Sequence, residues 1–473
     1  MTLTKSQQLA MEAFEAGYSF FLTGKAGTGK SFVTRQIIDS CKASGKQVLV
    51  CAPTGIAAIN VGGVTIHSAF RAPVGIIEPG KRCVDSRKIK ILEAADVILI
   101  DEISMCRLDL FEYVTNSIKS LKKKKQLILV GDFYQLPPVI TESEEEAYKR
   151  VYDSIYPFQS PLWDAMGIKT IELKECVRTQ EKDLVKALDN IRVGIPSFDI
   201  FKSSDKPDKQ AVSLATTNKR ADEINQEGLR KLKNPEFLEA RVVDNFPEKD
   251  MPTNKTLKVA PGARVMLLNN TDHWVNGTLG TLKTISDDYV TISLDNGETY
   301  PVQRNKWEAK EYRTAEEKDE RGKKKTVLKQ YTIGEFHQFP IKLAWAITVH
   351  KSQGQTYDRV NIYPERFFSP GQMYVALSRC KTLDGMNIIG TLTKKGLICS
   401  KEVINFMAGN KAVKSLKLGG KREGAGRKAK FGHKTKLYRL PEYSAEQESL
   451  LYELARMLLE PEKAAMLHEF IKK

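Results

Sequence analysis

Cysteines are few in this chain, and none is spaced to bind a metal. Seven are spread over 473 residues without a C-x-x-C pair, which argues against a zinc or iron–sulfur site and against a disulfide framework. The first residues lack the apolar core of a secretion signal, and no apolar run approaches the length that crosses a membrane. We therefore expect a soluble protein without a membrane partner, located in the cytoplasm.

Acidic residues are too few to balance the basic ones. The chain has 58 Asp and Glu against 74 Lys and Arg, which gives a formal net charge of +16 and is typical of a protein that binds a polyanion. The excess is uneven, because residues 410–440 hold eleven Lys and Arg and one Glu. A chain of 473 residues with 41% hydrophobic content is too long for one core, so we expect two large domains with smaller insertions.

Residues 24–31 read GKAGTGKS, the spacing of a phosphate-binding loop. An apolar run at 18–22 predicts a strand before the loop, and apolar residues at helical spacing in 32–38 predict a helix after it, which is the context that this loop requires. Backbone N–H groups would enclose the phosphates of ATP, Lys30 would reach the β- and γ-phosphates, and the Ser31 hydroxyl would ligate Mg²⁺. The expected nucleotide contacts in the loop are Gly24, Ala26, Gly27, Thr28, Gly29, Lys30 and Ser31.

Further positions fit the same chemistry. Gln7, just upstream of the loop, is placed to read the adenine edge with its amide, although such a glutamine commonly only starts a helix. The apolar strand 97–100 ends at Asp101, which would hold Mg²⁺, and at Glu102, which would orient the attacking water. Gln135 follows another apolar strand and would sense the γ-phosphate and report its loss to a second domain.

Four segments together resemble the successive motifs of superfamily-one DNA helicases, in their Pif/RecD-like branch. They are GKAGTGKS, APTGIAAINVGGVTIHSAF, DEISM and GDFYQLPPV, and the likeness ends near residue 408. The resemblance implies an α/β fold in which two RecA-like parallel-sheet domains bind ATP between them while single-stranded DNA crosses their tops. It implies a helicase that moves 5′ to 3′ on single-stranded DNA and unwinds forked or tailed duplexes. We expect a monomeric motor of bacterial or phage-like origin, associated with the nucleoid.

The resemblance also assigns residues in the second half of the chain. Arg178 matches the arginine that reaches the γ-phosphate from the opposite domain, and Arg379 matches a second phosphate-sensing arginine. Gln353 and Gly354 lie toward the phosphates in the motif LAWAITVHKSQGQT. For Thr217 and Asn218 a helix N-cap is the alternative to a DNA contact, and for His67 a core histidine is. The expected DNA contacts are Pro53, Thr54, His67, Thr217, Asn218, Thr348, His350 and Lys351.

The pattern along the chain predicts where the domains lie. Residues 1–150 form RecA-like domain 1A with a small 1B insertion around 71–95, and residues 151–408 form RecA-like domain 2A. Short strands with Asn-Gly turns predict an SH3-like β-barrel, domain 2B, inserted around 261–340. Within it the charged stretch 308–326 is expected to be a mobile hairpin tip.

Residues 409–473 form a basic C-terminal extension. Its composition suits a segment that tracks phosphates, followed by a strand-helix-helix DNA-binding unit that would dimerise with a second copy. A packed helical hairpin and a protein-docking tail are the alternatives.

Other functions share some of these motifs. A translocase that strips proteins from DNA would show DNA-stimulated ATPase without separating strands. An ATP-gated DNA-binding switch would have negligible turnover, and Glu102 with Arg178 and Arg379 argues against it. A small-molecule kinase fits poorly because it would lack the second α/β half.

Overall fold

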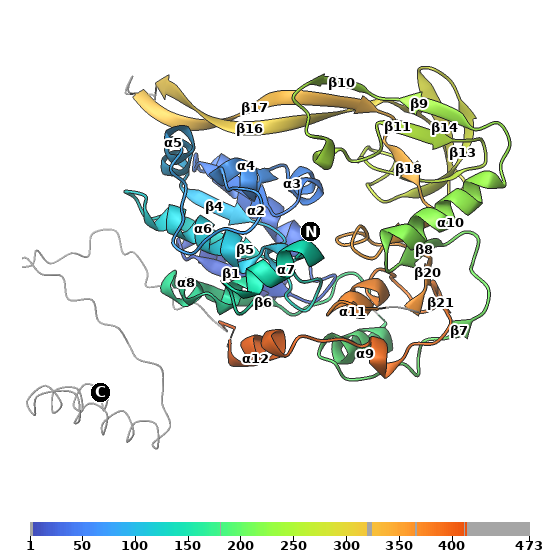
Figure 1. Cartoon of the computed structure of the whole chain (residues 1–473), viewed down its shortest axis with the longest axis horizontal. Helices are drawn as coiled ribbons and strands as arrows, with labels where there is room; N and C mark the ends of the chain where they lie inside the picture. The colour runs from blue at the N-terminus through green and yellow to red at the C-terminus, as the bar shows by residue number, and fades with distance from the viewer. Residues whose placement is uncertain (1–2, 180, 319–323, 365–366, 411, 414–473) are drawn as a thin grey trace, which may run out of the picture. The chain divides into compact units, whose positions relative to one another are not determined.

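The structure is a computed structural model that describes residues 3–179, 181–318, 324–364, 367–410 and 412–413 (Figure 1). The predicted strand-helix-helix unit of the basic extension, and its dimerisation, therefore lie outside the described residues. Within the described part of the chain, no helix has both the length and the apolar character needed to cross a membrane.

The first half is built on a six-stranded parallel sheet in the order β3-β2-β4-β5-β1-β6. Its central strands are almost continuously apolar and buried, as strands covered on both faces must be. The strands are β1 (Phe20–Gly24), β2 (Val48–Ala52), β3 (Val64–Thr65), β4 (Val97–Ile100), β5 (Gln126–Val130) and β6 (Lys169–Leu173).

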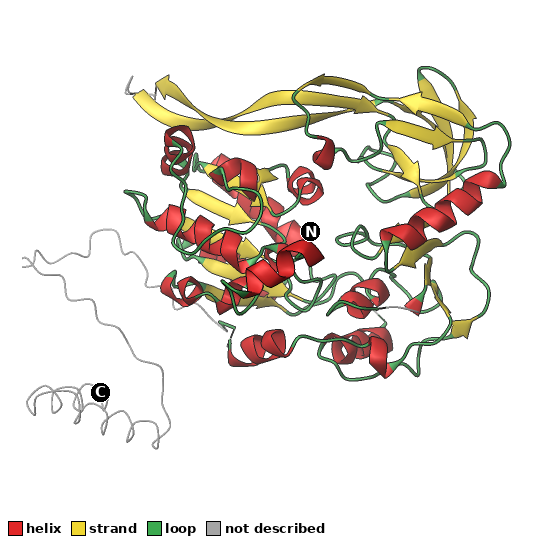
Figure 2. Cartoon of the chain, in the orientation of Figure 1, coloured by secondary structure: helices red, strands yellow, loops and turns green. Residues whose placement is uncertain are grey.

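Helices pack on this sheet, as the red coils of Figure 2 show. Several of them start at side chains that satisfy free backbone N–H groups, as when Thr4 and Gln7 form a reciprocal capping box at the first helix. The helices of this half are α1 (Lys5–Glu15), α2 (Lys30–Ala43), α3 (Gly55–Val61), α4 (Ile66–Phe70), α5 (Ser86–Ala94), α6 (Leu108–Lys119), α7 (Glu142–Lys149) and α8 (Pro161–Ala165).

A second parallel sheet of five strands, in the order β19-β8-β20-β21-β7, forms the base of the second half. Two parallel sheets in one chain confirm the predicted α/β class. The strands are β7 (Ser203–Ser204), β8 (Val212–Ala215), β19 (Ala346–Thr348), β20 (Val360–Ile362) and β21 (Met386–Ile389). The helices that follow or join them are α9 (Lys182–Arg192), α10 (Asn218–Arg230), α11 (Gln372–Leu377) and α12 (Lys401–Gly409).

The antiparallel part inserted in the second half is larger than the predicted 261–340. It starts at Glu236 and ends at Leu343, while its five-stranded sheet runs from Arg264 to Leu343, close to the predicted bounds. One five-stranded sheet has the order β15-β14-β13-β12-β18, and its SH3-like character stays a prediction. The strands are β9 (Glu236–Glu239), β10 (Arg241–Asp244), β11 (Thr256–Val259), β12 (Arg264–Leu267), β13 (Leu279–Ile285), β14 (Tyr289–Leu294), β15 (Thr299–Gln303), β16 (Asn305–Lys318), β17 (Lys324–Gln338) and β18 (Ile341–Leu343).

Strand β6 lies within the range predicted for domain 2A, which begins at residue 151, but it belongs to the first sheet. It pairs with β1 along its whole length at the edge of that sheet. From the other end of the chain, α12 returns to the same core, where the Phe406 ring stacks on Phe158 with centroids 4.1 Å apart. An apolar strand has the same sequence pattern in either sheet, so only its partner decides its domain.

The charged hairpin of β16 and β17 is not a free tip over its described length. Figure 1 shows the two strands extended alongside the first half. Tyr312 is buried there and accepts a hydrogen bond from Val50 N at 3.5 Å, and Leu328 N donates to Gln47 Oε1 at 2.8 Å. Because the charged residues alternate with apolar ones, one face of the hairpin can pack while the other stays in water.

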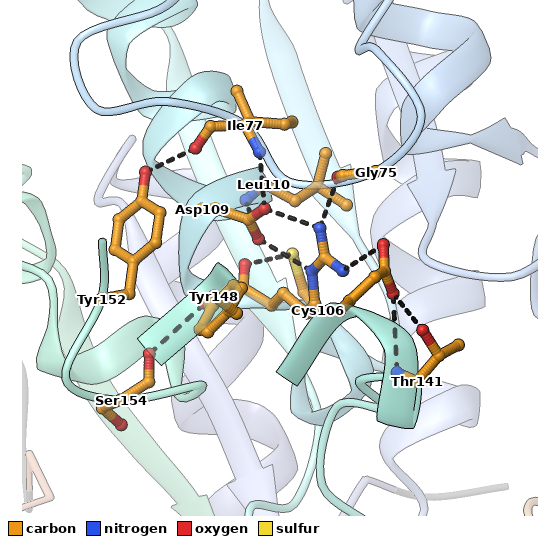
Figure 3. A network of polar contacts seen from close by, with 11 residues as sticks. Gly75, Ile77, Cys106, Asp109, Leu110, Thr141, Tyr148, Tyr152 and Ser154 are labelled. Atoms are coloured by element: carbon orange, nitrogen blue, oxygen red, sulfur yellow. Dashed lines mark hydrogen bonds and ion pairs between the residues drawn. The ribbon is translucent and has the colours of Figure 1, made fainter. Parts of the chain in front are cut away.

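The predicted 1B stretch, residues 71–95, holds a loop followed by α5. A network of polar contacts fixes the loop to α6, as Figure 3 shows. The carboxylate of Asp109 accepts hydrogen bonds from Ile77 N at 3.0 Å and from Arg107 Nη2 at 2.6 Å, while Tyr152 Oη donates to Ile77 O at 2.7 Å. This small insertion is therefore a rigid part of the first half rather than a separate domain.

Asp109→Asn is expected to lower the free energy of unfolding by about 3 kcal/mol, because it leaves the half-buried Arg107 without its fully buried partner. Denaturant unfolding followed by fluorescence measures the change. The matched control is Glu145→Gln, which breaks an exposed pair with Lys149 and should cost less than about 0.5 kcal/mol. Equal small losses in both variants would contradict the expectation.

Candidate active site and nucleic-acid interface

The predicted phosphate loop connects β1 to α2 in a shape that needs glycine. Gly27 and Gly29 have φ of 79° and 86°, in the left-handed region that side chains rarely adopt. A Cβ on Gly27 would lie 2.4 Å from the Cβ of Arg178, and one on Gly29 would lie 2.6 Å from Nε2 of Gln7. The glycines thus permit both the turn and the close approach of its neighbours.

Lys30 is held inside the loop. Its Nζ donates to Gly24 O at 2.8 Å and to Lys25 O at 3.2 Å, where an incoming phosphate would find it. Burial lowers the pKa of Lys30, while the charges of Asp132 and Glu102 oppose that effect. The loop is closed by Thr28, whose Oγ1 donates to Lys25 O at 2.9 Å.

Asp101 and Glu102 stand together at the end of β4. Burial, followed by the charge of Glu102, raises the pKa of Asp101 to about 7. Burial also raises the pKa of Glu102, against the opposing charges of Lys30 and Arg379. Glu102 has a left-handed φ of 51°, and such strain in a non-glycine residue is typical of functional sites.

Side chains from the second half reach this site. Gln353 Nε2 donates to Glu102 Oε2 at 3.0 Å, and Ala26 N donates to Tyr374 Oη at 2.8 Å. The resemblance placed Gln353 toward the phosphates, and here its amide contacts Glu102 beside the loop. Tyr374 was not predicted as a site residue, because nothing local shows that it faces another sheet. The site therefore lies between the two halves.

Both predicted arginines lie in this interface. Arg178 Nη1 donates to Ser378 O at 2.7 Å, but the arginine follows β6 of the first sheet, so its predicted origin in the opposite domain is wrong. Arg379 is fully buried, and burial together with the charge of Arg178 lowers the pKa of Arg379 to about 9. Because Arg178 and Arg379 repel each other, the site favours the binding of an anion near both of them.

Gln135 and its neighbours form a buried polar group at the end of β5. Gln135 Nε2 donates to Asp132 Oδ2 at 3.2 Å. The other carboxylate oxygen accepts from Arg192 Nη2 at 2.9 Å. Arg192 was not predicted, since an arginine at the end of an amphipathic helix normally lies at the surface.

The remaining predicted nucleotide contacts lie around the loop. Gln7 has both ends of its amide engaged, because Nε2 donates to Thr28 O at 3.1 Å and Oε1 accepts from Thr4 N at 3.0 Å. It supports the loop here, and adenine reading stays a prediction. Ser31 is exposed in the first turn of α2, and Gly354 has a left-handed φ of 78° with open space around its Cα.

The predicted DNA contacts follow strands of both parallel sheets at their carboxyl ends, where such sheets bind ligands. Thr54 Oγ1 caps α3 after β2, and Thr217 Oγ1 caps α10 after β8, so the N-cap alternative for Thr217 is what the structure shows. Thr348 ends β19, which pairs with β8. The others are near these ends: Pro53 and His67 in the first half, and Asn218, His350 and Lys351 in the second.

A cavity of about 260 Å³ is lined by residues of the α3–α4 region and of the antiparallel part, His67 and Asp250 among them. The Asp250 carboxylate is pressed against the start of α3, so that a Cβ on Gly55 would be 2.0 Å from Asp250 Oδ1. A carboxylate thus occupies the place beside Thr54 where a DNA phosphate was expected.

Known proteins resemble this chain over most of its length. The family described as PIF1-like helicase matches residues 2–192. The ATP-dependent DNA helicase Pif1 of Campylobacter jejuni is 30% identical over 417 residues, which are 80% of this chain and 91% of that protein. The counterpart from Bdellovibrio bacteriovorus is 28% identical over 430 residues, covering 85% of this chain and 91% of that protein.

A solved structure of Bacteroides sp. Pif1 in complex with ADP-AlF4 aligns with a TM-score of 0.77 at 33% identity, covering 86% of this chain and 97% of that one. The overall fold of this chain is thus similar to that of a solved Pif1 structure. This chain belongs to the PIF1-like helicase family and is an ATP-dependent DNA helicase.

Proposed function

We propose that this helicase hydrolyses Mg²⁺-bound ATP between its two parallel sheets and moves 5′ to 3′ along single-stranded DNA, opening tailed or forked duplexes as a monomeric motor. One segment of the second half carries the proposal. It contains Thr348, a proposed DNA contact, and Gln353, whose amide donates to Glu102 at 3.0 Å. DNA contact is thereby joined to the group that would orient the attacking water. The direction rests on the resemblance to the Pif/RecD-like branch.

Mg²⁺ fits the residues at the start of α2 and the end of β4. Ser31 and Asp101 would hold it. Burial, followed by the charge of Glu102, raises the pKa of Asp101, and a bound cation would favour its charged form. The ion would supply positive charge against the β- and γ-phosphates.

Side chains of the protein would bind the phosphates, activate the water and stabilise the transition state. Lys30 would bind the β- and γ-phosphates, and Glu102 would orient the water and accept its proton. Arg178 and Arg379 would stabilise the charge that develops on the transferred phosphoryl group. Since Arg379 and Gln353 come from the second half, hydrolysis would require the two halves to close on ATP.

DNA would be held mainly by its backbone. Thr54 and Thr217 present hydroxyls at strand ends, and Lys351 is an exposed cation three residues after Thr348, which is itself buried. Contacts of this kind position a strand without reading its sequence, which suits a motor that must bind every step of its track.

The test is ATP-dependent unwinding of duplexes that carry either a 5′ or a 3′ single-stranded tail, with Lys30→Ala as control. Unwinding from the 5′ tail alone is expected. Unwinding from the 3′ tail would overturn the direction. DNA-stimulated ATPase without any unwinding would replace the proposal with a translocase that displaces proteins.

Asp250→Asn is expected to raise the affinity for single-stranded DNA about two- to fivefold, because the charged carboxylate lies against the start of α3 and would repel a DNA phosphate there. Fluorescence anisotropy with a labelled oligonucleotide measures it at fixed salt. Asp288→Asn, in the exposed turn between β13 and β14, makes the same charge change elsewhere. An equal gain in both variants would show a general charge effect instead.

A further inference from the structure

Arg192 joins the two halves beside the proposed ATP site. It ends α9 in the second half, its side chain is 6% exposed, and Nη2 donates to Asp132 Oδ1 at 2.9 Å. Asp132 follows β5 of the first sheet and is fully buried. The pair is therefore a buried ionic contact between elements that belong to different sheets.

The partner carboxylate holds Gln135, the proposed sensor of the γ-phosphate. Asp132 Oδ2 accepts from Gln135 Nε2 at 3.2 Å, and Oδ1 accepts from Tyr134 N at 3.2 Å. The Arg192 guanidinium lies over the Tyr134 ring, 4.2 Å from its centroid. Arg192 thus contacts Asp132 and Tyr134, two residues of the turn that leads to Gln135. Through Asp132 it also helps to fix the position of the Gln135 amide.

Charge keeps this link in place. Burial alone would raise the pKa of Asp132, but Arg192 and Lys30 outweigh it and hold that pKa below its usual range. Asp132 in turn outweighs the burial of Arg192 and raises its pKa. Both groups stay ionised, and Lys30 feels both charges. When a phosphate binds or leaves beside Lys30, the change in local charge therefore acts directly on the pair of Arg192 and Asp132.

One feature distinguishes Arg192 from a side chain that only stabilises the fold. Its helix, α9, contacts the first half a second time, through the ion pair of Asp189 with Lys25 in the phosphate loop. One helix is therefore attached to both the phosphate loop and the Gln135 turn.

We propose that Arg192 is a positioning residue that couples the γ-phosphate state to the second half. It fixes Gln135 through Asp132, and when the phosphate leaves, the change at Gln135 and Lys30 is passed to α9. The inference rests on the proposed function. Arg192 does not itself contact the nucleotide in this scheme.

The test compares Arg192→Gln with Arg264→Gln. Arg264 is also a buried arginine paired with an aspartate, Asp295, but it lies in the antiparallel part. For Arg192→Gln we expect a KM for ATP within about threefold of the wild type, at least tenfold loss of DNA-stimulated kcat, and more ATP consumed per base pair unwound. Arg264→Gln should keep the wild-type ratio of DNA-stimulated to basal ATPase, even where its stability falls.

A double-mutant cycle shows whether Arg192 acts through Gln135. Gln135→Ala, Arg192→Gln and the double variant should share about the same stimulation ratio, because removing either end breaks one link. Additive losses, or an unchanged ratio in Arg192→Gln, would overturn the proposal. If Arg192→Gln does not fold, Arg192→Lys is used instead, because it keeps the charge but loses the planar guanidinium. Its stimulation ratio should fall below that of the wild type, and an unchanged ratio would contradict the proposal. If the wild type does not unwind tailed duplexes, the proposed function is wrong, whatever the Arg192 variants show.

Discussion

Glu102→Gln is expected to lower kcat for DNA-stimulated ATP hydrolysis by about 10²–10⁴-fold while ATP still binds. Glutamine has the shape of the native side chain and can keep the contact with Gln353, but it cannot accept a proton. Burial raises the pKa of Glu102, which makes the carboxylate a stronger base than an exposed glutamate. The loss should therefore fall on the chemical step and leave ground-state binding of the nucleotide nearly unchanged.

Steady-state ATPase with saturating single-stranded DNA gives kcat, and equilibrium titration with a fluorescent ATP analogue gives affinity. Glu145→Gln, exposed on α7, controls for the loss of one negative charge. Turnover within tenfold of the wild type, at equal nucleotide affinity, would exclude Glu102 as the base and leave the water to be oriented by another group.

The glycine loop and the strand-end carboxylates could be predicted from sequence because their physics is local. A left-handed turn at Gly27 and Gly29 and an apolar strand that ends in Asp101 are fixed by neighbouring residues. Lys30, Asp101 and Glu102 were therefore predicted at positions that the structure brings to one site. The class of two parallel-sheet domains, in contrast, was implied by the resemblance to the helicase family.

What the sequence could not supply depends on partners far along the chain. Strand β6 pairs with β1, Phe406 packs on Phe158, and the buried Tyr312 contacts Val50 of the first sheet. None of these contacts leaves a local pattern, because an apolar side chain looks the same whichever core it joins. Arg192 was missed for the same reason, since only the fold shows that the end of α9 faces Asp132.

Arg379→Ala is expected to lower kcat for ATP hydrolysis by about 10³–10⁵-fold, the size of effect that an arginine finger supplies. In the structure the guanidinium is held by carbonyl oxygens of its own half, with Nε donating to Val375 O at 2.8 Å and Nη1 to Gln355 O at 3.2 Å. Burial beside Arg178 lowers its pKa to about 9. The cation is therefore poorly compensated until an anion such as the γ-phosphate arrives.

Guanidinium rescue separates lost charge from lost structure. Alanine leaves a buried space that matches the missing group, so millimolar guanidinium should restore part of kcat in Arg379→Ala, and methylammonium should restore less. Arg379→Lys should stay impaired, because a point charge cannot reproduce the planar fork that satisfies Val375, Ser352 and Gln355 at once. Turnover of Arg379→Ala within tenfold of the wild type would refute the role. Loss without rescue, at unchanged ATP affinity, would instead assign Arg379 to holding the 352–355 segment, and with it the contact of Gln353 with Glu102.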